Sequence, residues 1–258
     1  MRPNRLAPSG KAPWRDVGTR SARTTPTTLS SATYLTSALA WLGEHDRART
    51  LGQDTQERCR TTLGPDHPTT LGSAAQWSFT LLGLGQVDQA RSLSLDTAQR
   101  ARQTLGTHHP TTLVAAVGLT FALAWLGEAD EARPIGEETL ERCGQAFGAD
   151  HWLTLLGAAA LTFALVKLGE RERAGSISEQ SFRRAEQLFG QDHWVTLLAA
   201  AAFTFALGGL GEAEQARTLG LDTLDRSGRT LGAQHPITVS LREQVALVDG
   251  PDDRTSAD

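Results

Sequence analysis

The sequence predicts an all-α fold in which pairs of helices stack into a right-handed α-α superhelix. Three observations predict it: a turn motif recurs every 42 residues, a nearly apolar run follows each copy, and an amphipathic run follows that. A period between 20 and 50 residues is typical of stacked supersecondary units, which add units instead of enlarging one core. The copies of the motif, of the form His-Pro-Thr-Thr-Leu, begin at His67, His109, His151, His193 and His235, and Thr25 begins a copy without the histidine.

The apolar run of each unit predicts a first helix. Residues 112–126 are almost entirely apolar and end at Gly127. A glycine at the end of such a run predicts a helix C-cap in the left-handed conformation. A proline directly after the histidine, as at Pro110, suits the first turn because its missing N–H has no helical partner there. The equivalent glycines are Gly43, Gly85, Gly169 and Gly211.

The amphipathic run of each unit predicts a second helix. Acidic residues such as Glu128 begin it, as the positive end of a helix dipole favours. Apolar residues then recur at helical spacing, with arginines and acids on the outer side. A small residue recurs inside this helix, where we expect close contact between helices to require it: Gly52, Ser94, Gly136, Ser178 and Gly220.

This reading gives a repeat array over residues 25–248, with a single capping helix at 236–248. The predicted two-helix units are 25–66, 67–108, 109–150, 151–192 and 193–234. Residues 1–24 are basic and rich in proline, which predicts a disordered tail, and residues 249–258 predict a short acidic one. Neither an apolar leader nor a run of about 20 apolar residues is apparent, so we expect no membrane association and a cytoplasmic protein.

The two cysteines, Cys59 and Cys143, are two full periods apart. They therefore occupy the same place in two units that are not neighbours. A disulfide needs Cα atoms within about 7 Å, so we expect none, and we expect each cysteine to act as a small packed side chain.

The repeated histidines do not predict a metal site. Ligands must lie about 2 Å from one ion, whereas helices pack about 8–10 Å apart, so histidines of successive units cannot converge. We expect them to bond the turn between units and to cap the next helix. No phosphate-binding or nucleophile motif is present, and the acidic pairs lie outside any apolar pocket. The sequence thus predicts no enzyme, no cofactor and no metal, and the net charge of −4 predicts no nucleic-acid binding by the array.

Together, the paired helices, the turn glycine and the Leu-Gly-x-x-His-Pro-x-Thr junction resemble tetratricopeptide repeats of the 42-residue kinesin-light-chain type. Alanine keeps register five residues after each turn glycine, at Ala48, Ala90, Ala132, Ala174 and Ala216. The resemblance covers about residues 25–247, and it implies an actinobacterial source. It also implies that first helices line a concave groove for peptides. An Asn pair that commonly grips peptide there is replaced, apart from Gln76, by residues such as Val117-Gly118.

Carried further, this register places one phenylalanine per unit on the groove side. The candidate groove residues are Gln76, Phe79, Phe121, Trp125, Phe163, Lys167 and Phe205. Three interpretations remain open for such an apolar strip: a partner covers it, tight curvature buries it between first helices, or a homodimer forms. If the groove interpretation holds, replacing Phe121 and Phe163 by Ser abolishes partner capture and leaves melting largely intact. If the double variant unfolds instead, these side chains are core and the groove hypothesis fails.

The sequence therefore predicts a non-enzymatic protein-interaction module that binds a peptide or an amphipathic helix in an apolar groove. Its partner would be a protein of unknown identity. Two alternatives stay open: a sensor or regulatory fragment of a larger actinobacterial signalling protein with an NTPase, and a self-associating repeat protein.

Overall fold

The computed structural model describes residues 25–41 and 44–248, and within these ranges every regular element is an α-helix. The expected tails, residues 1–24 and 249–258, and Gly43 lie outside the described residues. The eleven helices are α2 (Pro26–Trp41), α3 (His45–Leu63), α4 (Pro68–Gly83), α5 (Val87–Thr104), α6 (Pro110–Leu126), α7 (Ala129–Phe147), α8 (Trp152–Leu168), α9 (Arg171–Phe189), α10 (Trp194–Leu210), α11 (Ala213–Thr230) and α12 (Pro236–Val248).

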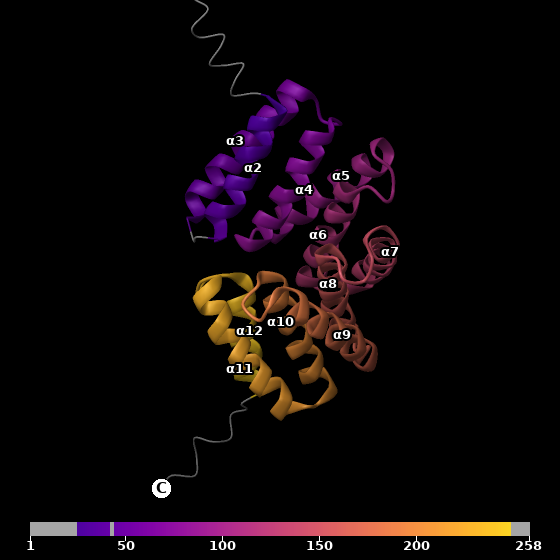
Figure 1. Ribbon diagram of the computed structural model, residues 1–258, viewed down its shortest axis with the longest axis vertical. Helices are drawn as coiled ribbons and strands as arrows, with labels where there is room; N and C mark the ends of the chain where they lie inside the picture. The colour runs from indigo at the N-terminus through magenta and orange to yellow at the C-terminus, as the bar shows by residue number, and fades with distance from the viewer. Residues whose placement is uncertain (1–24, 42–43, 249–258) are drawn as a thin grey trace, which may run out of the picture.

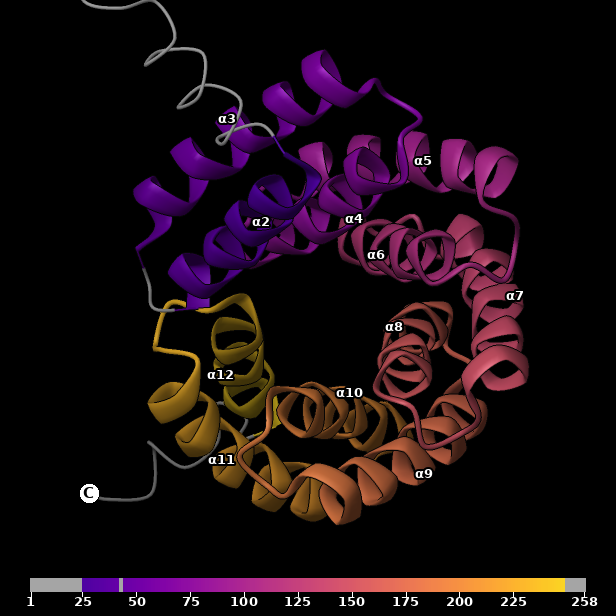
Figure 2. The ribbon, with the colours of Figure 1, turned by 45° about the horizontal axis from the view of Figure 1, so that its top comes forward.

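The helices stack in sequential pairs, which confirms the predicted all-α solenoid. Helices α2, α4, α6, α8, α10 and α12 lie on the inside of the curve, and α3, α5, α7, α9 and α11 form the outer layer (Figures 1 and 2). Figure 2 shows that one turn of the array nearly closes a ring, which brings α12 beside the end of α2. Ala40 of α2 and Ile237 of α12 accordingly line the same cavity.

Each repeated histidine begins an inner helix, as predicted. In the turn before α6, the Nδ1 atom of His109 accepts a hydrogen bond from the Thr111 backbone N–H at 3.2 Å, and Pro110 occupies the first turn. The first unit has no such histidine, and there the Thr25 hydroxyl accepts from the Thr28 N–H at 3.2 Å. The same histidine cap occurs at His67, His151, His193 and His235.

The predicted glycine caps and small residues also have clear structural causes. Gly127 ends α6 with a φ of 82°, in the left-handed region that favours glycine. Gly169 and Gly211 cap α8 and α10 in the same way, whereas the C-cap of α4 is Leu84, one residue before Gly85. At Gly52, a Cβ atom would lie 2.3 Å from the Trp77 ring, so the close approach of these helices requires glycine.

The core runs along the inner helices and is continuous from unit to unit. Helix α8 is buried from Leu153 to Leu165, because α6 and α10 flank it and α7 and α9 cover its outer side. Cys59 and Cys143 are buried and unpaired, as predicted. Burial raises the pKa of the Cys143 thiol to about 12, so this thiol stays protonated and acts as a small packed group.

Arginines on the outer helices pair with acids of the turn before the neighbouring inner helix and with acids of their own helix. Arg100 contacts Asp66 at 2.9 Å and Asp96 at 2.8 Å. Two periods along the chain Arg184 contacts Asp150, and three periods along it Arg226 contacts Asp192. These ion pairs are exposed, and such pairs contribute about 0–1 kcal/mol each. The outer surface of the array is therefore charged, and the apolar surface that could serve as a binding site lies on the inner helices.

Candidate functional site

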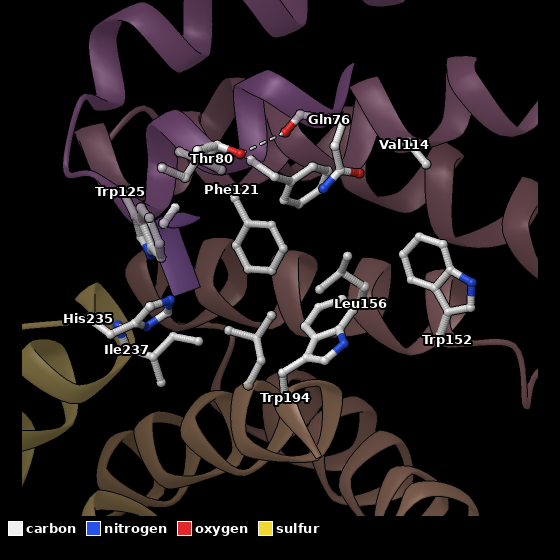
Figure 3. A pocket seen from close by; sticks show the side chains of 15 residues that line it. Gln76, Thr80, Val114, Phe121, Trp125, Trp152, Leu156, Trp194, His235 and Ile237 are labelled. Atoms are coloured by element: carbon white, nitrogen blue, oxygen red, sulfur yellow. Dashed lines mark hydrogen bonds between the residues drawn. The ribbon is translucent and has the colours of Figure 1, made fainter. Parts of the chain in front are cut away.

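The inner helices line a partly open apolar cavity of about 170 Å³, which we call the lumen cavity. Its walls come from α2, α4, α6, α8, α10 and α12, so both ends of the array contribute. Figure 3 shows the Phe121 ring in the middle, with other aromatic side chains and Gln76 arranged around it. The lining residues are Ala40, Gln76, Phe79, Thr80, Leu82, Gly83, Val114, Phe121, Trp125, Trp152, Leu156, Trp194, Leu198, His235 and Ile237.

A second, larger hollow of about 950 Å³ adjoins the lumen cavity and shares Leu82, Gly83 and Trp125 with it. It lies between the C-terminal ends of the inner helices, the start of α3, and α12. Charged side chains reach this second hollow, among them Arg49, Lys167 and Glu243.

The structure distributes the predicted groove residues over these two spaces. Four of them line the lumen cavity, namely Gln76, Phe79, Phe121 and Trp125. Trp125 also lines the second hollow, together with the remaining three predicted residues, Phe163, Lys167 and Phe205. All seven candidate residues therefore face the interior of the curve, but they do not line a single common pocket.

The four phenylalanines form a continuous ladder along the inner helices. The ring centroids are 6.4 Å apart between Phe79 and Phe121, 6.1 Å between Phe121 and Phe163, and 5.4 Å between Phe163 and Phe205. Phe121 is only 2% exposed and Phe163 only 9%. Both belong to the core, whereas Phe79 and Phe205 are half-buried.

This burial corrects one expectation. Replacing Phe121 and Phe163 by Ser cannot leave melting intact, because each ring packs against its neighbours in the core. Tight curvature buries these two rings between inner helices. The hypothesis of a groove whose binding surface includes Phe121 and Phe163 therefore fails. Binding inside the curve must be tested with other side chains.

Two tryptophans that sequence reasoning placed only in the first helical turn prove to line the lumen cavity. Trp152 begins α8 and Trp194 begins α10, with ring centroids 6.1 Å apart. Trp152 is 37% exposed. The available signal was the change from proline, at Pro68 and Pro110, to tryptophan at the same position of the next two units.

Besides the indole N–H groups of Trp125, Trp152 and Trp194, the polar groups in the lumen cavity are few and come from α4 and the turn that begins α12. The Gln76 amide donates from Nε2 to the Ser37 hydroxyl at 3.1 Å, and the Thr80 hydroxyl donates to the Gln76 backbone carbonyl at 3.3 Å. Burial, together with the nearby His45, lowers the pKa of His235 to about 4. His235 is therefore neutral at pH 7, and no Asp, Glu, Lys or Arg is among the described residues that line the cavity.

The histidines use their Nδ1 atoms as caps, so these atoms are not available as ligands. Burial also lowers the pKa of His151 and His193, which stack on Phe147 and Phe189. In the part of the chain that the structure describes, no group of three or more His, Cys, Asp or Glu side chains could hold a metal ion. Among the described helices, none is long and apolar enough to cross a membrane.

Comparison with known proteins agrees with this architecture. The family model described as "Tetratricopeptide repeat" matches residues 28–69, 70–111, 112–153 and 196–237, more than half of the chain. The chain therefore belongs to the tetratricopeptide repeat family. Members of this family are typically non-catalytic protein-interaction modules. No curated protein matches the chain.

Several solved structures share the fold. Two crystal structures of Podosopora anserina putative kinesin light chain nearly identical TPR-like repeats, one of them a single-substitution variant, are 21% identical. The variant structure has a TM-score of 0.60, and the match covers 80% of this chain and 97% of that one. BtubC (BKLC) from P. vanneervenii is 15% identical with a TM-score of 0.59, covering 94% of this chain and 92% of that one. These likenesses establish the fold, and the actinobacterial source stays a prediction.

Proposed function

We propose that the protein binds an apolar segment of a partner protein, a peptide or one face of an amphipathic helix, against the interior of its curve. One observation carries the proposal: five aromatic side chains from four inner helices line the lumen cavity, and no charged side chain of the described residues joins them. Large aromatic anchors in apolar pockets dominate the energy of many protein interfaces. The family's typical function as an interaction module supports the same conclusion.

The chemistry of the two spaces defines the partner segment. The lumen cavity favours a neutral, apolar side chain, because an unpaired charge there would lose its hydration. Two basic side chains, Lys167 and Arg49, line the second hollow. The structure shows no ion pair for Lys167 among the described residues, and Arg49 pairs with the exposed Asp46. A segment that carries an acid beside its apolar residues would match both spaces.

Selection from a displayed peptide library tests the proposal. The wild-type chain is the bait, and Gly83→Leu is the counter-selection bait. Gly83 lines both spaces, and a Cβ atom there would meet nothing within 4 Å, so this position of the wall has room for the start of a side chain. We expect enriched peptides that are apolar, lack Lys and Arg, and bind wild type but not Gly83→Leu. Enrichment of peptides that bind both baits equally would place recognition elsewhere and refute the proposal.

A second candidate function, self-association, has its own observation. On α2 at the open end of the array, Tyr34 is 70% exposed and Leu35 is 53% exposed. Burying such side chains against a second copy would give a homodimer. Light scattering at about 50 µM, far above the Kd range of stable dimers, tests this candidate. A wild-type dimer that becomes a monomer when both Tyr34 and Leu35 are replaced by Ser would support it. A monomeric wild type would exclude it. The signalling-fragment alternative stays a prediction.

A further inference from the structure

The lumen cavity has the size of a small-molecule site. Its volume is about 170 Å³, and an engineered apolar cavity of about 150 Å³ is known to stay dry and to bind benzene. Residues of six inner helices surround the cavity, including Ala40 near one end of the array and Ile237 near the other. The space is therefore suited to one aromatic ring and is walled by side chains that are far apart in the sequence.

The lining supplies the contacts that an aromatic ring prefers. Aromatic pairs favour tilted or edge-to-face arrangements with centroids about 4.5–7 Å apart. Phe121 already makes such contacts with Phe79 at 6.4 Å and with Trp125 at 6.0 Å. Trp152 and Trp194 approach from the other side of the cavity, as Figure 3 shows. A guest ring would be held among aromatic faces and edges.

The electrostatics of the cavity select a neutral guest. The lining drawn from the described residues includes no Asp, Glu, Lys or Arg. His235 is uncharged at pH 7, because burial and the neighbouring His45 lower its pKa to about 4. An ionised guest would lose its hydration without gaining an opposite charge, which is strongly unfavourable.

Besides the indole N–H groups of the lining tryptophans, the Gln76 amide is a polar group in the wall that a guest could reach. The Gln76 amide uses one end for the Ser37 hydroxyl, at 3.1 Å. Among the described residues, the structure gives no hydrogen bond to the other end of this amide. The neighbouring Thr80 hydroxyl is occupied by the Gln76 backbone carbonyl and by Ser37. Gln76 therefore offers one hydrogen-bonding position at the edge of a mostly apolar space.

We propose that the lumen cavity binds a neutral, single-ring aromatic small molecule with one hydroxyl or N–H group, with the ring against Phe121 and the polar group on the Gln76 amide. This site goes beyond the proposed protein-binding function and needs no protein partner. It would be occupied in the free chain.

Phenol is the probe that tests this site, by isothermal titration with the full-length chain at pH 7. A phenolic hydroxyl has a pKa of about 10, so phenol is neutral there. We expect saturable binding of one molecule, with a dissociation constant of about 1 mM or lower. Benzoate, which has a similar ring but a negative charge, should bind at least about tenfold more weakly, since its charge would be buried without a partner.

Two variants assign the binding to this cavity. Gly83→Leu adds a large side chain at the wall of the cavity and should abolish phenol binding. Gly144→Leu is the matched control, because Gly144 is an exposed position of α7 where a Cβ atom also meets nothing within 4 Å. It should bind phenol like wild type.

Gln76→Leu separates the polar contact from the apolar one. Loss of one hydrogen bond should weaken the binding of phenol by about threefold to tenfold. Toluene cannot make that bond, so its affinity for the variant should be within about twofold of its affinity for wild type. Three results would overturn the proposal: no saturable phenol binding to wild type, phenol binding that survives Gly83→Leu, or benzoate binding as tightly as phenol.

Discussion

His109 and Thr111 are joined across the start of α6: the Nδ1 atom of His109 accepts a hydrogen bond from the Thr111 backbone N–H at 3.2 Å. The same bond recurs one period later between His151 and Leu153. The histidines recur in the sequence like a series of metal ligands, but each one caps a helix. It sets where each inner helix begins, and so where the interior side chains point.

Replacing His109 by Ala should lower the free energy of unfolding by about 1 kcal/mol, as loss of an N-cap does. His109→Asn should recover most of this, because asparagine is itself a good cap. His108→Ala is the control, since His108 is exposed and its ring is hydrogen-bonded to the hydroxyl of the neighbouring Thr107, not to the backbone N–H of a helix start. Urea unfolding of the three variants measures the differences, and equal losses in His108→Ala and His109→Ala would contradict the capping role.

Replacing Gly52 by Ala should destabilise the first two units. The new Cβ would lie 2.3 Å from the Trp77 ring, and such overpacking typically costs about 1–3 kcal/mol. Gly144→Ala should instead stabilise by up to about 1 kcal/mol, because it meets nothing and alanine favours the helix. Thermal unfolding measures the stability of both variants. If close packing is the reason for glycine at position 52, the midpoint falls in Gly52→Ala and rises in Gly144→Ala.

Replacing Phe121 by Ser should destabilise the fold, not merely the site. Phe121 is 2% exposed, and truncating a buried Phe costs about 3–5 kcal/mol. Trp152→Ala, at a 37% exposed side chain, should cost under about 1 kcal/mol. Urea unfolding checks both values, and a Phe121→Ser variant as stable as wild type would mean that its ring is not in the core.

Stability should fall as the pH drops below about 6.5. The pKa of His235 is lowered to about 4 in the fold, while an unfolded histidine titrates near about 6.5, so the unfolded chain binds the extra proton first. The contribution of neutral His235 to the free energy of unfolding is fully present above about pH 6.5 and is lost as the pH falls towards about 4. This contribution is at most about 3 kcal/mol. His235→Asn keeps a cap without this titration.

Urea unfolding of wild type and His235→Asn at pH 7 and pH 4.5 isolates this effect. Other groups titrate in both proteins, so the comparison of interest is the difference between their pH-dependent losses. Wild type should lose more. If both lose the same free energy, His235 does not titrate as its buried position requires.

The sequence was sufficient for the fold because the period, the caps and the small residues each have a local cause. Gly127 ends a helix and Gly52 admits the Trp77 ring whatever lies further along the chain. Closure of the array is different, since a small rotation per unit accumulates over the whole solenoid. The approach of α12 to α2 therefore could not be predicted from any one unit.

The site was predicted only in part for the same reason. The period placed a phenylalanine on the inner face of each unit, and the register of Gln76 and Trp125 followed from it. Whether Phe121 is exposed depends on the curvature, and it is buried. The tryptophans at the start of α8 and α10 reach the cavity because inner helices converge there, which sequence spacing alone does not show.

Calorimetric titration of a library-selected partner peptide tests most directly whether the interior is the binding surface. The variant Trp152→Ala with Trp194→Ala removes two partly exposed rings from the lumen cavity. Its control, Leu95→Ala with Leu221→Ala, removes exposed apolar side chains from the outer helices α5 and α11. We predict at least about a tenfold loss of affinity in the first, about 1.4 kcal/mol, and none in the second. Undiminished binding by the tryptophan variant, with loss in the leucine variant, would contradict an interior site.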